Sequence, residues 1–228
     1  MNHSMSYPMI KHLVLKDWYF QRWPIGAYTA GGLLGLGFVA LGTNWSFYAG
    51  TVLLITFMIT IGIHLAMVTV VQERTEQTLP FIMSLPVSPR EYTTAKVLAN
   101  LLIFMIPWLA LTAGAMLILS SEGARSGAMI PFALIVLTEM LAGYILVLTV
   151  AIITESQGWT LWAMGITNLF FQGFLYWVSH IPSIARGMKG HGAVWDRTAI
   201  TLLAAEILIS VALLGLAFLG RARKRDLL

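Results

Sequence analysis

Residues 72–100 read QERTEQTLPFIMSLPVSPREYTTAKVLAN and separate two long apolar runs of the chain. Only 11% of all residues are charged. Six ionisable side chains nevertheless gather in this stretch: Glu73, Arg74, Glu76, Arg90, Glu91 and Lys96. The hydrocarbon core of a bilayer strongly disfavours so many charges. The stretch is therefore predicted to lie at a membrane surface or beyond it, between two membrane-spanning segments.

Apolar residues at helical spacing run through the first half of this stretch: Leu79, Ile82, Met83, Leu85 and Pro86. Pro86 and Pro89 then bracket a turn, and Ser88 is a suitable cap for a second short helix that begins near Arg90. The pattern predicts a short helix that lies across the membrane surface. Such a helix is suited to docking on a soluble partner.

The residues that carry a family resemblance are Glu73-Arg74, Thr78-Leu79, Ser84-Leu85-Pro86-Val87-Ser88-Pro89-Arg90-Glu91 and Lys96. In order and spacing they resemble the cytoplasmic loop of type-2 ABC-transporter permeases. The sequence departs from the usual form at Gln77, where Gly is common, and at Pro80, where an acidic residue is common. The resemblance implies that the loop is a coupling helix between the second and third spans. The ATPase-coupling residues it implies are Glu73, Arg74, Glu76, Thr78, Leu79, Ile82, Met83, Leu85, Pro86 and Arg90.

The composition excludes a soluble domain, because 58% of the residues are hydrophobic and the mean hydropathy is +0.80. Cysteine is absent, which excludes disulfides, thiolate metal sites and cysteine nucleophiles. The net charge of +4 does not indicate nucleic-acid binding, because the basic residues flank apolar runs, as orientation signals do. Residues 1–228 are predicted to form one transmembrane domain in contact with membrane lipid.

The predicted fold class is an all-α membrane protein with six transmembrane helices. An N-terminal amphipathic interfacial helix is predicted at 8–23, with Gln21 on its polar face, and a cytoplasmic coupling segment at 72–96. The predicted spans cover about 24–42, 47–71, 97–119, 129–153, 159–178 and 199–219. The first span carries Ala27, Gly31 and Gly35 at four-residue spacing, which lets another helix approach closely. A helix of this chain and a helix of a second copy both fit that pattern.

The distribution of basic residues predicts the orientation. With six spans and both termini inside, ten of the 14 Lys and Arg residues lie on the inner side. The remaining four are Arg125, Arg186, Lys189 and Arg197. Short loops rich in Lys and Arg remain in the cytoplasm. The chain is therefore predicted to be a multi-pass protein of the inner membrane with both termini cytoplasmic.

Signatures of the chain's own chemistry are missing from the sequence. No Walker-type phosphate loop, no paired His-Glu zinc motif and no Gly-x-Ser-x-Gly elbow occurs in it. If transport is driven by ATP, the ATP and Mg must therefore bind a separate polypeptide. No cofactor, catalytic residue or metal ligand is predicted in this chain.

Three ionisable residues fall within predicted spans: His64, Glu139 and Glu206. Intramembrane charges are unfavourable, and each of these should face a cavity or a partner. Asn168 and Gln172 add polar groups to the aromatic fifth span. These five residues either line a substrate path or form structural hydrogen bonds between helices. The unequal depths of His64, Glu139 and Glu206 argue against a shared metal site.

The leading functional hypothesis is a transmembrane permease subunit of an ATP-driven ABC exporter. The resemblance implies two copies of a separate ABC ATPase and a second permease copy, identical or closely homologous, with export through the dimer interface. The alternative is a membrane-embedded lipid-modifying enzyme that uses Glu139, Glu206 and His64 as acid–base groups. A structural or assembly subunit is a third possibility. The identity of the substrate does not follow from the sequence.

Overall fold

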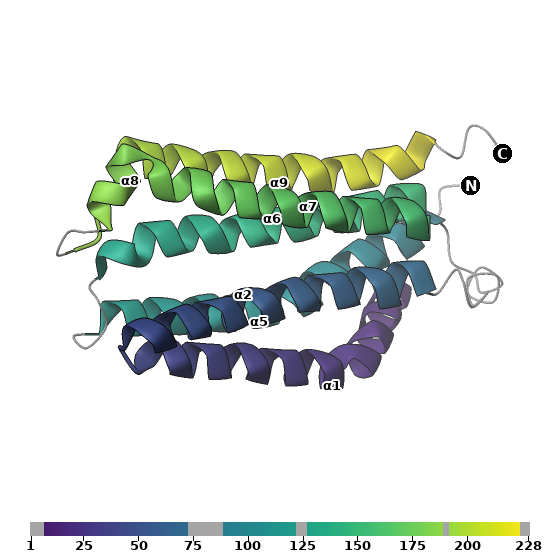
Figure 1. Cartoon of the computed structure of the whole chain (residues 1–228). Helices are drawn as coiled ribbons and strands as arrows, with labels where there is room; N and C mark the ends of the chain where they lie inside the picture. The colour runs from purple at the N-terminus through teal and green to yellow at the C-terminus, as the bar shows by residue number, and fades with distance from the viewer. Residues whose placement is uncertain (1–6, 73–88, 122–126, 189–191, 224–228) are drawn as a thin grey trace.

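The computed structural model describes residues 7–72, 89–121, 127–188 and 192–223, and all regular structure in these ranges is helical. Figure 1 shows two layers, one formed by α1, α2 and α5 and the other by α6, α7 and α9. The helices are α1 (Tyr7–Ala40), α2 (Asn44–Ala66), the π-helix η1 (Met67–Gln72), α5 (Pro89–Ser120), the 3-10 turn η2 (Gly127–Met129), α6 (Ile130–Thr154), α7 (Gln157–His180), α8 (Pro182–Gly187) and α9 (Arg197–Arg223).

Five helical segments are long and apolar enough to cross a membrane: Met9–Ala40, Asn44–Gln72, Glu91–Ser120, Gly127–Thr154 and Arg197–Leu219. The predicted all-α membrane architecture is therefore confirmed, with five candidate spans. The predicted span at 159–178 corresponds to α7, which runs beside α6 in the bundle (Figure 1). It is not among the five, because Asn168, Gln172 and several Trp and Tyr side chains lower its hydropathy. The count of six spans stays a prediction.

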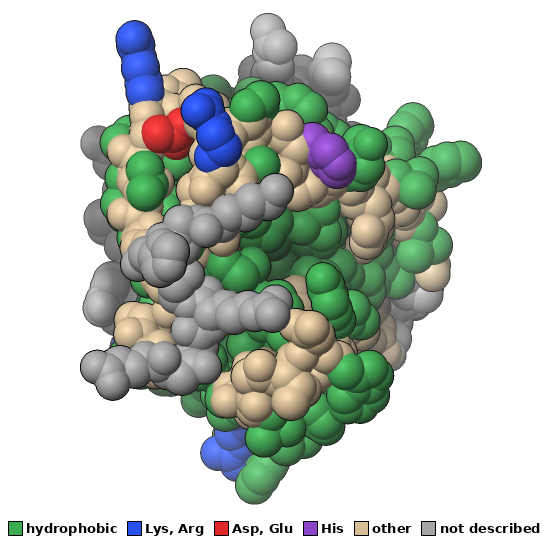
Figure 2. Space-filling model, turned by 60° about the vertical axis from the view of Figure 1, so that its left-hand side comes forward, with side chains coloured by type: hydrophobic (Ala, Val, Ile, Leu, Met, Phe, Trp, Pro, Cys, Tyr) green, Lys and Arg blue, Asp and Glu red, His purple; other side chains and the backbone are tan. Residues whose placement is uncertain are grey.

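The described start of α1, the end of η1, the start of α5 and the end of α9 lie at one end of the bundle, called the terminal end below (Figure 1). The turns between α1 and α2 and between α7 and α9 lie at the other end, called the far end. Figure 2 shows the molecule with the far end brought forward, and hydrophobic side chains are far more extensive on this face than charged ones. Many large apolar side chains are exposed, as expected of helices that face lipid.

The first helix differs from the prediction of an interfacial helix followed by a separate span. It is continuous through Pro24 and turns a corner in its N-terminal half (Figure 1). Proline removes one helical hydrogen bond and its ring crowds the preceding turn, which bends a helix without ending it. The predicted exposure of Gln21 on a polar face is wrong, because Gln21 is buried and its Oε1 lies 2.9 Å from His64 Nε2.

The small-residue stripe of the first span packs within the chain. A Cβ atom on Gly35 would lie 2.9 Å from both the Gly50 carbonyl oxygen and the Leu54 backbone nitrogen of α2. Gly31 faces the Phe57 ring, whereas Ala27 is exposed. The intrachain alternative is therefore the correct one for Gly31 and Gly35, and the α1–α2 backbones approach closely where Gly35 and Gly50 both lack a side chain.

Gly35→Leu is expected to destabilise the protein by about 1–3 kcal/mol or more, because the added side chain meets backbone atoms that cannot rotate away. Gly37→Leu is the matched control on the same helix, since a Cβ there meets nothing within 4 Å. We expect it to leave the thermal midpoint unchanged or slightly raised, because Leu favours helix more than Gly does. Thermal unfolding in detergent measures both. Equal midpoints for the two variants would contradict the close α1–α2 packing.

Helix α6 lies at the centre of the bundle, whereas α9 is peripheral. In an apolar 18-residue stretch of the α6 segment 78% of the residues are buried. In the corresponding stretch of α9 only 17% are buried. The buried residues of α9 form one narrow stripe that faces the bundle: Ala199, Glu206, Ser210 and Ala217. Thr149 of α6 donates a hydrogen bond to the Leu213 carbonyl across this contact, at 3.2 Å. Helix α9 thus meets the bundle through small and polar residues.

The predicted coupling segment divides at Pro89. Residues 73–88, and with them nine of the ten predicted coupling residues, lie outside the described residues. Helix α5 begins at Pro89, close to the predicted helix start near Arg90, but it continues to Ser120. The end of the predicted loop is therefore the first part of a membrane-spanning helix and not a separate short helix.

Candidate functional site

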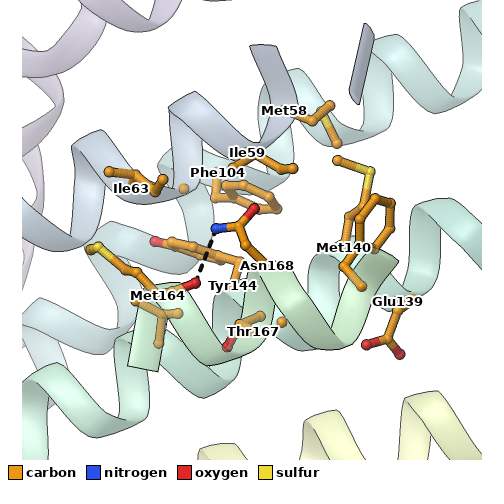
Figure 3. A pocket seen from close by; sticks show the side chains of 14 residues that line it. Met58, Ile59, Ile63, Phe104, Glu139, Met140, Tyr144, Met164, Thr167 and Asn168 are labelled. Atoms are coloured by element: carbon orange, nitrogen blue, oxygen red, sulfur yellow. Dashed lines mark hydrogen bonds between the residues drawn. The ribbon is translucent and has the colours of Figure 1, made fainter. Parts of the chain in front are cut away.

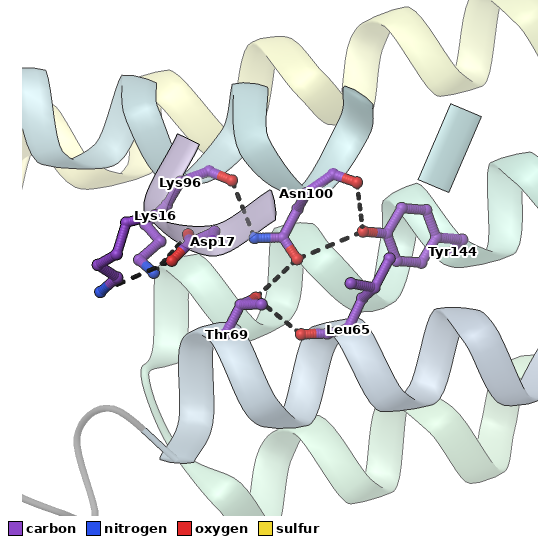
Figure 4. Close-up of polar contacts among 7 residues, drawn as sticks. All are labelled: Lys16, Asp17, Leu65, Thr69, Lys96, Asn100 and Tyr144. Carbon is purple, nitrogen blue, oxygen red and sulfur yellow. Dashed lines mark hydrogen bonds and ion pairs between the residues drawn. The ribbon is translucent and has the colours of Figure 1, made fainter. Parts of the chain in front are cut away.

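A buried ion pair joins α1 to α5 at the terminal end (Figure 4). The Lys96 Nζ atom lies 2.8 Å from Asp17 Oδ2, and the two side chains are only 5% and 6% exposed. Lys16 lies 3.6 Å from the other carboxylate oxygen and is 38% exposed. Lys96 is thus not solvent-exposed but buried between two helices with an acidic partner, and its place at the membrane surface stays a prediction. The pair fixes the bent N-terminal half of α1 against the start of α5.

Asn100, one turn further along α5, is fully buried and connects three helical segments (Figure 4). Its Nδ2 donates to the Lys96 carbonyl at 2.9 Å within α5. Its Oδ1 accepts from the Thr69 hydroxyl of η1 at 2.7 Å. The Tyr144 hydroxyl of α6 donates to the Asn100 carbonyl at 3.1 Å, with Asn100 Oδ1 at 3.5 Å. Asn100 therefore ties α5 to both η1 and α6.

The π-helix η1 contributes Thr69 to this polar network, which we define as Asp17, Lys96, Asn100, Thr69 and Tyr144. The Thr69 hydroxyl lies 2.7 Å from the Leu65 carbonyl as well as from Asn100 Oδ1. A hydroxyl has one proton to donate, so the two carbonyl oxygens share it or compete for it. Short π-helical turns occur often at functional sites. This one lies directly before the predicted coupling segment.

The Tyr144 side chain also lines a cavity of about 50 Å³ (Figure 3). Its ring stacks on Phe104 with a centroid distance of 3.9 Å and an interplanar angle of 14°. Side chains of α2, α5, α6 and α7 line this partly open cavity, mostly Met, Phe and Ile. Its polar lining comes from Glu139, Thr167 and Asn168, and Asn168 Nδ2 donates to the Met164 carbonyl at 3.0 Å. Flexible Met side chains make such a cavity adaptable in shape.

The structure separates the five predicted path residues. Glu139 and Asn168 line the cavity together. Gln172 is exposed on the outer side of α7 and is not part of the lining. His64 is directed toward α1, where it contacts Gln21 and lies edge-on to the Tyr28 ring at 5.4 Å. His64 is therefore not in the cavity with Glu139.

Glu206 lies close to Glu139, although the two are on different helices. Each is the tenth residue of its helix, α9 and α6, and both helices start at the far end. The two residues thus lie at a similar depth on two helices that pack together. Glu206 is 4% exposed, and neither of its carboxyl oxygens has a hydrogen-bond partner among the described residues. The Asp196 carboxylate accepts from the Ala199 backbone N–H at 2.9 Å and so caps the start of α9.

A helical bundle with five candidate spans, an apolar surface and a buried polar network defines a multi-pass integral membrane protein. The family model described as ABC-2 family transporter protein matches residues 37–174. Because this match covers more than half of the chain, the protein belongs to the ABC-2 transporter permease family, and the predicted family is confirmed. Comparisons with curated proteins and with solved structures gave no match.

Membership of this family identifies a membrane transport subunit, and such subunits generally lack an ATPase site of their own. The alternative of a lipid-modifying enzyme is not favoured. That alternative uses His64 together with Glu139 and Glu206, but His64 contacts α1 and is not part of the cavity lining.

In the sequence, Lys96 is recognisable as a charge and as part of the family pattern, but the polar network is not recognisable. Asn100 and Thr69 are isolated polar residues within apolar runs, which is a usable signal of an interhelical hydrogen bond. Nothing in the sequence shows which residues they meet. Lys96 and Asp17 are separated by 79 positions, and Tyr144 and Asn100 by 44.

Proposed function

We propose that this chain is the transmembrane permease subunit of an ATP-driven ABC exporter. In this proposal α7 is the fifth of six spans, and both termini and residues 73–88 are cytoplasmic in the inner membrane. A second permease copy, identical or closely homologous, completes a dimer. Two copies of a separate ABC ATPase bind ATP and Mg. Family membership and the basic residues concentrated at the terminal end support this assignment.

The coupling segment would act on two helices at once. Residues 73–88 connect η1 to α5, so a force applied to them by the closing ATPase dimer reaches both. The predicted apolar residues Leu79, Ile82 and Leu85 would fill a groove on the ATPase. Rigid attachment to two helices turns a displacement at the membrane surface into movement within the bundle.

The polar network would transmit this movement of α5 to three other helical segments, α1, η1 and α6. Lys96 transmits it to the bent half of α1 through Asp17, and Asn100 transmits it to η1 and to α6. The observation that carries the proposal is the double role of Tyr144. Its hydroxyl belongs to the network and its ring lines the cavity, so a shift of α5 must move a wall of the cavity or break the hydrogen bond.

The path residues fit this scheme in two groups. Glu139 and Asn168 lie in the cavity whose wall moves, and Gln172 lies on the outer side of α7, where a second copy could pack. A polar side chain exposed to lipid is unfavourable, and a dimer contact would provide it with a partner. Export between two subunits would then use the outer side of α7.

Tyr144→Phe tests the proposal, because it keeps the stacked ring and removes only the hydroxyl. A lost hydrogen bond of roughly 1 kcal/mol changes the balance between two conformations about five-fold. We expect the ATPase rate of the reconstituted complex to become about five-fold less responsive to the permease. Tyr176→Phe is the matched control, since Tyr176 is exposed on α7. An intact complex with wild-type coupling in Tyr144→Phe would contradict the proposed role of the network.

A further inference from the structure

We propose that Glu206 and Glu139 form a proton-binding pair between α9 and α6, so that the permease carries a titratable proton within its membrane-spanning region. The ligand is a proton taken from water, and the site is the space between the two carboxyl groups. Use of this proton in transport rests on the proposed function, but proton binding does not.

The environment of Glu206 disfavours an ionised carboxylate. It is the only charged residue between Thr198 and Leu219. Although most of α9 is exposed, Glu206 is turned inward and is 4% exposed. Both of its carboxyl oxygens are without a hydrogen-bond partner in the described part of the chain. A carboxylate buried in this way would have lost its hydration without replacement, which is strongly unfavourable.

No Lys or Arg of the described residues lies at this depth to compensate a negative charge. The sequence has no Lys or Arg between Ile130 and His180 or between Thr198 and Leu219. Helix α9 packs against α6, α5 and α8, whose other described charged or titratable groups are Tyr144, Glu91, Tyr92, Lys96 and Arg186. Tyr144 donates to Asn100, and Lys96 is paired with Asp17 at the terminal end. Arg186 is at the far end, where its Nε donates to the Pro182 carbonyl.

Two ionised carboxyl groups on facing helices would repel each other. Like charges that share a buried site disfavour the doubly ionised state, because no counter-charge among the described residues lies between them. A proton removes the repulsion at once. The protonated oxygen of one residue can also donate a hydrogen bond to the other, which supplies the partner that Glu206 otherwise lacks.

The groups available near the pair favour a proton over a metal ion. Figure 3 shows the Glu139 carboxylate directed away from the Phe104 and Tyr144 rings. A metal ion would need further ligands, and no group of three or more His, Cys, Asp or Glu side chains gathers within the described ranges. The transfer itself is simple: hydronium gives its proton to a Glu206 oxygen and leaves as water.

Infrared titration of the purified permease in nanodiscs, without ATPase or nucleotide, tests the pair. The carbonyl stretch of a protonated carboxyl group is expected to persist at neutral pH and to disappear in alkaline buffer. Glu206→Gln should remove or greatly weaken this band. Glu139→Gln should move its titration midpoint by about one pH unit or more, because the neighbouring charge is gone. Glu155→Gln, in the turn after α6, is the matched control and should leave the band unchanged.

Glutamine resembles the neutral acid in shape, so both Gln variants should keep the wild-type thermal midpoint at neutral pH. A band missing from the wild type at neutral pH would overturn the proposal. So would a band that persists unchanged in the Glu139→Gln/Glu206→Gln double variant. Because the measurement uses neither nucleotide nor ATPase, its outcome is independent of the Tyr144→Phe experiment. Either proposal can fail while the other holds.

Discussion

Asp17→Asn is expected to lower the free energy of unfolding by about 3–5 kcal/mol, because it removes the negative charge that compensates a buried ammonium group. The Lys96–Asp17 distance of 2.8 Å and the low exposure of both side chains are the basis of this value. Thermal and denaturant unfolding in detergent, followed by tryptophan fluorescence, measure it. The loss should be nearly independent of salt, because buried pairs are screened much less than exposed ones.

A double-mutant cycle separates the pair from its surroundings. Lys96→Met alone should destabilise by a similar amount, whereas Asp17→Leu/Lys96→Met together should recover much of the loss, since an apolar pair of similar volume replaces an ion pair well. Lys16→Met is the matched control, because Lys16 is adjacent in sequence, lies 3.6 Å from the same carboxylate and is 38% exposed. It should change stability by less than about 1 kcal/mol. If Lys16→Met destabilised the protein as much as Asp17→Asn, the stabilising role of the buried Lys96–Asp17 pair would be contradicted.

Leu85→Glu/Pro86→Glu is expected to abolish association with the ATPase. We expect these residues to fill an apolar groove of the partner, and two carboxylates in a desolvated contact would oppose binding by several kcal/mol. Co-purification from cells that express both subunits gives the result. Ser120→Glu/Ser121→Glu adds the same charge to exposed positions at the far end and should leave the complex intact. Undiminished co-purification of the Leu85/Pro86 variant would count heavily against residues 73–88 as the coupling segment.

The sequence predicted what depends on local properties. Long apolar runs predicted the candidate spans, and the 73–96 pattern predicted the family. Gly31 and Gly35 predicted a close helix approach, but α2 could be identified as the partner only in three dimensions. Pro24 suggested a boundary between two helices, yet a proline can bend a helix that packing on both sides holds together.

Contacts between distant positions could not be predicted. Glu139 and Glu206 were each recognised as intramembrane carboxyl groups. Their proximity depends on how α6 and α9 start at the same end and pack together, which no spacing in the sequence encodes. Gln21 was assigned to a polar surface because of its chemistry, but the corner in α1 turns it toward His64. A polar residue in an apolar run signals that a partner exists without identifying it.

The six-residue π-helix at the end of α2 has a consequence for any mutational scan of this helix. Wider turns change the angular step per residue, so a helical wheel drawn at 100° assigns wrong faces beyond Ala66. Three consecutive residues, Thr69, Val70 and Val71, are in fact all buried. Sensitive positions should therefore recur every three or four residues as far as Leu65, and then occur side by side at Thr69, Val70 and Val71.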